Sequence, residues 1–265
     1  MKIRFIAAAM VISLFGIQFA YAGSQESKPA VSGINSKISG GYADLDAAST
    51  KFGSASITLP VTHCFGLAID GLGGDYSASS LWGVGGNLFW RDPDKGLIGI
   101  MGSNVQVGAN NVSRGGVSGE LYLGRFSVLT DVGHETGDTI KHGVFSDLTF
   151  RCYVIDNFVL NAGCAYSGRN TAGVVGFEYM PALKTLPGLT LFARGSVGES
   201  DYHSVMAGVK YYFGNGKTLK QKHREDDPEN TALSGLLLGS QGEGGFTNNP
   251  ETSPAEGDGD DGGPM

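Results

Sequence analysis

The sequence predicts an all-β fold, an antiparallel up-and-down transmembrane β-barrel of about 12 strands followed by a disordered C-terminal tail. Three observations predict it. Apolar and polar residues alternate in successive segments between residues 36 and 214, with turn residues between the segments. Glycine accounts for 43 of the 265 residues and only 17% are charged, a composition unlike that of an ordinary soluble domain. The N-terminus also has the form of a secretion signal.

The signal peptide is expected at residues 1–22. Lys2 and Arg4 give it a positive start, residues 6–19 are mostly apolar, and residues 20–22 fit a small-x-small cleavage pattern. The mature chain would then begin at Gly23, with an N-terminal segment at residues 23–35, and would be exported to the outer membrane of a Gram-negative bacterium. No later segment has the roughly 20 continuous apolar residues that a membrane helix needs.

The alternating segments define the predicted strands of a barrel at residues 36–214. They are expected at residues 37–45, 52–61, 64–74, 79–91, 96–107, 114–124, 126–135, 142–154, 157–167, 172–180, 188–198 and 203–213. Clusters of Gly, Asp, Asn and Pro between them are what tight turns require. An even number of strands places both ends of the barrel on one side of the membrane, and the short connections after the even-numbered strands indicate the periplasmic side.

The two faces of each strand differ in polarity. In the segment 142–154, Val144 and Phe150 share one face, whereas Asp147 and Arg151 share the other. A membrane barrel gives this pattern with the apolar face toward lipid, and a soluble sandwich gives it with the polar face toward water. Aromatic residues near the strand ends and a polar face rich in small residues favour the barrel. A secreted soluble β-sandwich binding protein is the alternative.

Nine charged residues fall on the face that would line the lumen. They are Asp70, Arg91, Glu120, Asp131, Asp147, Arg151, Glu178, Arg194 and Lys210. Because charges cannot stay unpaired away from water, a mixed network of ion pairs is expected that either fills the lumen or lines a narrow aqueous channel.

The last predicted strand has the form of an assembly signal. Val209, Tyr211 and Phe213 share its apolar face, and outer-membrane barrels commonly end in such a strand. The expected partners are therefore outer-membrane lipid and the barrel-assembly machinery. Phe213 is internal here, because 52 residues follow it.

The tail at residues 215–265 is first basic, then acidic and rich in glycine, so it is predicted to be mostly disordered. Its apolar stretch at 231–239 is short enough to form one helical or hooked segment. Docking onto a periplasmic partner, docking back into the lumen and an untethered linker all stay open. Without a basic stripe, no nucleic-acid partner is expected.

The sequence predicts no catalytic site, metal site or cofactor. Its five histidines lack zinc-ligand spacing, and no serine lies in a nucleophile elbow. The three cysteines are Cys64, Cys152 and Cys164, and their odd number argues against a disulfide framework. They are interpreted as small apolar side chains on the strand faces, and a single disulfide bridge is the alternative. An outer-membrane lipid-modifying enzyme is a second alternative, since a catalytic triad is defined by geometry rather than by spacing.

Four stretches carry a family resemblance: "FWRDPDKGLIGIMGS" (89–103), "GELYLGRFSV" (119–128), "GRN" (168–170) and "KQKHREDDPEN" (220–230). Together they resemble a family of uncharacterised proteobacterial outer-membrane β-barrel, porin-like proteins, over roughly residues 37–230. The resemblance implies a barrel and supplies no catalytic residue. The expected function is a porin-like narrow channel or a structural barrel with a charged lumen.

Overall fold

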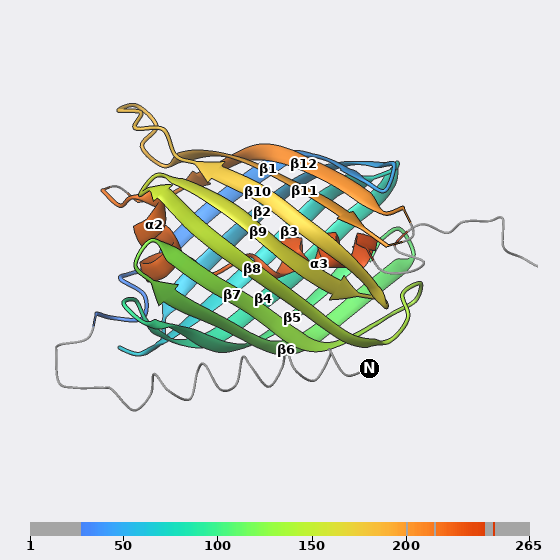
Figure 1. Cartoon of the computed structure of the whole chain (residues 1–265), viewed down its shortest axis with the longest axis horizontal. Coiled ribbons are helices and arrows are strands. Elements are labelled where there is room, and N and C mark those ends of the chain that lie inside the picture. The colour runs from blue at the N-terminus through green and yellow to red at the C-terminus, as the bar shows by residue number, and fades with distance from the viewer. Residues whose placement is uncertain (1–27, 200, 215, 242–245, 247–265) are drawn as a thin grey trace, which may run out of the picture.

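The computed structural model describes residues 28–199, 201–214, 216–241 and 246. The predicted signal peptide and residues 23–27 lie outside these residues. Within them, twelve antiparallel strands form one closed barrel, in which each strand pairs with its sequence neighbours and β12 pairs with β1 (Figure 1). The predicted fold class and all twelve predicted strands are confirmed.

The strands have similar lengths. They are β1 (Asn35–Leu45), β2 (Ala48–Pro60), β3 (Phe65–Tyr76), β4 (Ser79–Asp92), β5 (Gly96–Val107), β6 (Asn110–Leu123), β7 (Phe126–Gly137), β8 (Gly143–Ile155), β9 (Phe158–Ser167), β10 (Asn170–Tyr179), β11 (Leu189–Gly198) and β12 (His203–Tyr212).

Two strands begin four residues earlier than the sequence predicts. β2 starts at Ala48 and β6 at Asn110, because the turns that precede them are tighter than expected. Asp46 and Ala47 both have positive φ angles, 56° and 63°, as in the two-residue turn that suits a twisted hairpin. Asn-Gly or Asp-Gly normally marks such a turn, so "DA" is a weak signal for it.

Successive residues of each strand face the outside and the inside of the barrel in turn. Large apolar side chains remain exposed on the outer surface of the barrel, among them Ile100, Val117, Phe150, Val175 and Val205. Polar and charged side chains from the same strands are buried inside. This is the arrangement that a barrel in lipid requires, with an apolar belt outside and a polar interior.

The barrel has two rims. β1 begins and β12 ends at the first rim, where the turns after β2, β4, β6, β8 and β10 also lie. The turns after β1, β3, β5, β7, β9 and β11 lie at the second rim. Buried Ala30 and Val31, ahead of β1, pack at the first rim against Ala68, Phe89 and Leu97.

After β12 the chain turns back into the barrel. A single helical turn α2 (Leu219–Gln221) and the π-helix η2 (Lys222–Asp226) lie at the first rim, and α3 (Thr231–Gln241) lies in the lumen (Figure 1). The expected disorder of the tail therefore does not extend to residues 216–241, and its apolar stretch lies in the lumen. Residues 247–265 lie outside the described residues. The described helices include none that is long and apolar enough to cross a membrane.

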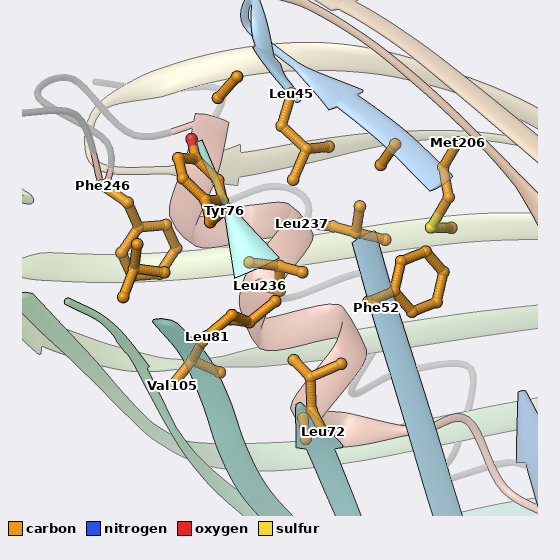
Figure 2. Close-up of a cluster of buried hydrophobic side chains, with 14 of the residues drawn as sticks. Leu45, Phe52, Leu72, Tyr76, Leu81, Val105, Met206, Leu236, Leu237 and Phe246 are labelled. Carbon is orange, nitrogen blue, oxygen red and sulfur yellow. The ribbon is translucent and has the colours of Figure 1, made fainter. Parts of the chain in front are cut away.

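The helix α3 runs through the lumen and packs mainly against the wall formed by β3 to β6. Leu236 and Leu237 lie among apolar side chains from the strands, and Phe246 adds to the same cluster (Figure 2). The strand residues of this cluster include Leu45, Phe52, Leu72, Tyr76, Leu81, Val105 and Met206. Since the barrel surrounds α3, nine of its eleven residues are buried, and burial rather than helix propensity stabilises so short a helix.

Candidate functional site: the occupied lumen

The barrel wall holds the N-terminal end of α3 by polar contacts. Asp70 of β3 accepts hydrogen bonds from the Thr231 amide (2.9 Å) and from its hydroxyl (2.8 Å). Asn230 donates to Ser56 Oγ (2.9 Å) and accepts from the Leu233 amide (2.7 Å). The first backbone N–H groups of a helix have no partner within the helix, so these contacts satisfy them.

A buried ion pair holds the middle of α3. Arg114 of β6 donates to the Glu135 carboxylate of β7 at 3.0 and 2.8 Å, and their side chains are 1% and 0% exposed. The same guanidinium donates to the Gly235 carbonyl of α3 (2.5 Å) and to Ser167 Oγ (3.0 Å). Neither Arg114 nor Glu135 was among the predicted lumen residues, although strand alternation places both on the inward face.

The C-terminal end of α3 reaches the second rim. Gln241 donates to the carbonyls of Ala165 (2.9 Å) and Asn170 (3.1 Å), beside the turn after β9. Beyond α3, the Phe246 ring packs on Tyr76 with its centroid 5.8 Å away. The described chain thus crosses the lumen from the first rim to the second.

At the first rim, ion pairs tie the segment to the barrel. Lys37 of β1 donates to Asp227 (2.6 Å), with both side chains under a tenth exposed. Lys217 bonds Asp226 (2.7 Å), which also accepts from Ser32 Oγ (2.6 Å). The acids that follow β12 in the sequence therefore pair with bases, one of them inside the barrel.

The imidazole of His223 in η2 lies between two tyrosines. Its Nδ1 lies 3.1 Å from the Tyr153 hydroxyl and its Nε2 lies 3.1 Å from the Tyr212 hydroxyl. The Glu178 carboxylate is 3.5 Å from Nε2. Burial lowers the pKa of His223 below its ordinary value, although Glu178 opposes that shift, so the ring is neutral at pH 7.

A cavity of about 90 Å³ remains beside α3, along the wall formed by β8 to β12 and β1. Three ion pairs lie in or beside it: Lys210–Glu178 (3.0 Å), Arg151–Glu229 (3.6 Å) and Arg194–Asp147 (3.8 Å). Glu229 lies deep in the barrel, yet 34% of its side-chain surface is accessible, because it faces this cavity. Burial would raise the pKa of Glu229, but Arg151 and Arg194 together lower it below its ordinary value.

The structure places all nine predicted lumen residues on the inward face. Asp70 contacts α3, and Asp147, Arg151, Glu178, Arg194 and Lys210 lie in or beside the cavity. Arg91 lies over the Phe89 ring at 4.7 Å, and Glu120 accepts a hydrogen bond from Tyr122 (2.8 Å). Asp131 shares the alternation of buried Leu129 and Glu135.

The predicted assembly-signal residues face outward. Val209 and Phe213 are 50% and 43% exposed, and the rings of Tyr211 and Phe213 contact edge to face. These side chains therefore lie on the outer surface of the barrel.

The polar side chains do not assemble a Ser-His-acid triad around three of the histidines. His142 Nδ1 bonds Thr136 (2.7 Å), His203 Nδ1 bonds the Asp201 carbonyl (3.2 Å), and His223 bonds two tyrosines. Cys64, Cys152 and Cys164 are free thiols, so no bridge joins them.

Comparison with known proteins finds relatives by fold alone. No family model and no curated protein matches the chain. Among solved structures, the KdgM porin in complex with disordered oligogalacturonate matches with a TM-score of 0.53 and 14% identity, over 67% of this chain and 99% of that one. The COG4313 outer membrane channel from Pseudomonas putida F1 matches with a TM-score of 0.53 and 8% identity, over 72% of this chain and 100% of that one. The chain therefore has the fold of outer-membrane porins and channels.

Proposed function

We propose that the chain is a porin-like outer-membrane barrel whose lumen is closed by its own C-terminal segment. The single observation that carries the closure is the placement of α3 in the lumen, bonded to Asp70 at its start, to Arg114 at its middle and to Ala165 at its end. The apolar belt outside and the polar interior support the membrane location. The porin-like fold supports the channel class.

The closure is partial, because α3 leaves a cavity along the opposite wall. A space of this size holds on the order of three water molecules. Release of the segment would join this space to the volume that α3 now fills and would open a passage with ion pairs on one wall and the apolar cluster on the other. The full chain is therefore a closed or weakly conducting state, and the barrel without the segment is the open one.

Single-channel conductance in a planar bilayer tests the proposal. The full chain is expected to be silent or to give small steps, and a chain that ends at Gly216 is expected to give much larger discrete steps. A chain that ends at Phe246 is the matched control, because it loses residues after the segment and keeps α3. Gel mobility without heating verifies that each variant folds into a barrel.

A second variant keeps the full length. Replacement of Leu236 and Leu237 by Asp places charges where apolar side chains pack, so it should expel α3 and raise conductance without altering any strand. Equal conductance of the full chain, the Leu236/Leu237 variant and the chain ending at Gly216 would refute closure by the segment.

The lipid-modifying enzyme has no observation of its own in favour of it. The histidines at the second rim bond to Thr136 and to a backbone carbonyl rather than to a serine. Hydrolysis of a short-chain ester by the folded protein would be the result that revives this alternative.

A further inference from the structure

Two arginines in the cavity make ion pairs but no hydrogen bond. Arg151 lies 3.6 Å from Glu229 and Arg194 lies 3.8 Å from Asp147, and neither guanidinium donates a hydrogen bond to a residue that the structure describes. The Arg151 Nε is fully buried without a partner. A guanidinium has five N–H donors, and leaving them unsatisfied in a buried site is costly.

An unpaired acceptor lies beside these donors. Asn161 of β9 is opposite Arg151 of β8 in the strand register, and its Oδ1 is buried without a partner. Both residues line the cavity. Asn161 Oδ1 is itself inaccessible from the cavity, so the groups that face the cavity as hydrogen-bond donors are the two guanidinium groups.

The carboxylate nearest to Arg151 comes from the C-terminal segment. Glu229 precedes α3 by two residues, and its separation from Arg151 exceeds the usual hydrogen-bond range. Arg194 lines the same cavity as Glu229, and both arginines lower the pKa of Glu229. Glu229 and Asp147 therefore balance the charge of the arginines without making hydrogen bonds to them, and a carboxylate that is free to orient in the cavity is able to accept such bonds.

We propose that Arg151 and Arg194 form a binding site for a small carboxylate, with Glu229 as its built-in competitor. The carboxylate takes paired hydrogen bonds from the guanidinium groups. The neighbouring charges are already paired, as Lys210–Glu178 and Lys37–Asp227, so an added anion needs Glu229 to turn away.

This inference rests on the proposed closure, because it makes the solute a regulator of the segment. Glu229 cannot hold the arginines while the solute does, so solute binding weakens the docking of the segment. By linkage, docking weakens solute binding by the same factor. The full chain is expected to conduct more in lactate than in an equal concentration of lactamide.

Isothermal titration calorimetry of the full chain in detergent micelles tests the site directly, with lactate as the probe. Lactamide, which has the same shape without the charge, is expected to bind at least roughly ten-fold more weakly. Arg151→Gln and Arg194→Gln should each weaken lactate binding by about ten-fold or more. Arg169→Gln is the matched control, because Arg169 is exposed at the second rim.

Glu229→Gln gives the decisive result, since it removes the competitor. Lactate should bind about ten-fold more tightly to this variant, a gain that misfolding cannot produce. Equal binding of lactate and lactamide, or unchanged lactate affinity in Glu229→Gln, would overturn the proposal. Calorimetry needs no open pore, so lactate binding with a silent Gly216-ended chain would leave the site standing and the closure refuted. An open truncated barrel without lactate binding in the full chain would do the reverse.

Discussion

Asp70 of the barrel wall caps the helix that the barrel encloses, by accepting hydrogen bonds from both the amide and the hydroxyl of Thr231. The capping carboxylate comes from β3, 161 residues before the helix that it caps. A negative charge at a helix N-terminus also interacts favourably with the helix dipole. One strand residue therefore makes helix formation in the segment depend on entry into the lumen.

Replacement of Asp70 by Asn should loosen the segment. The loss of the charged cap costs about 1–2 kcal/mol, which raises the undocked population roughly 5- to 30-fold. Tryptic cleavage after Lys217, Lys220, Lys222 or Arg224 measures this population. Asp75→Asn is the matched control on the same strand, because Asp75 is exposed. Equal cleavage rates in the two variants would contradict the capping role.

Replacement of Glu135 by Gln should destabilise the barrel itself. It leaves the buried Arg114 guanidinium without its counter-charge, and breaking a buried pair in this way costs about 3–5 kcal/mol. The midpoint of urea unfolding, followed by gel mobility, measures the loss. Glu199→Gln, at the second rim, should change the midpoint little.

The double variant Arg114→Met/Glu135→Leu separates pairing from packing. Because apolar replacement of both partners leaves no buried charge, it should recover much of the stability that Glu135→Gln loses. A double variant as unstable as the sum of the single variants would show that the two side chains do not act as a pair.

Docking of the segment should weaken as pH falls below about 6.5, the ordinary pKa of histidine. Burial lowers the pKa of His223 in the docked state, so the undocked state binds more protons in acid. The stability contributed by neutral His223 is thus present above the ordinary pKa and is lost below it. Tryptic cleavage of the segment between pH 5 and pH 8 measures the change.

His223→Gln is the matching variant for this pH dependence. Glutamine keeps a donor and an acceptor for the Tyr153 and Tyr212 hydroxyls and does not titrate. Glu178, Arg151 and Lys210 also act on His223 and remain charged groups in the variant. Glu229, whose pKa is lowered, titrates at lower pH than this window. An unchanged cleavage profile in His223→Gln would exclude His223 as the titrating group.

The outer belt should reject charge at its centre more strongly than at its edge. Ile100 lies mid-strand in β5 and is 62% exposed, whereas Val61 lies just after β2 at the first rim and is 54% exposed. Ile100→Arg should cost about 2–4 kcal/mol of folding into lipid vesicles, and Val61→Arg about 0–1 kcal/mol. Equal folding yields would mean that the belt does not contact lipid.

The strands and their faces were predictable because strand alternation is a local property. Inward placement of Asp147 and Arg151 follows from their spacing alone, as does outward placement of Val144. The partners were not predictable, because pairing across a lumen depends on the closed ring. Nothing in the sequence near Arg151 indicates that Glu229, 78 residues later, lies beside it.

The helix α3 was ambiguous in the sequence for a physical reason. A segment of 11 residues is too short to be a stable helix by itself, and burial on almost every side leaves no polar face to read. Arg114 and Glu135 lie at the ends of the predicted strands 114–124 and 126–135, where lumen and rim positions look alike in sequence. Their role in holding α3 depends on the contact between Arg114 and the Gly235 carbonyl, which the sequence does not reveal.

The chain after β12 passes through a ring that the earlier chain closes. The β1–β12 seam completes that ring, and Phe246 has already reached the rim opposite to Asn35. The segment therefore cannot leave sideways, and α3 must slide at least its own length, about 16 Å, along the barrel axis to escape. The lifetime of the docked segment is therefore set by its whole movement along the axis rather than by the loss of any single contact. During assembly, either the strands close around the segment or the segment enters the lumen after the barrel has closed.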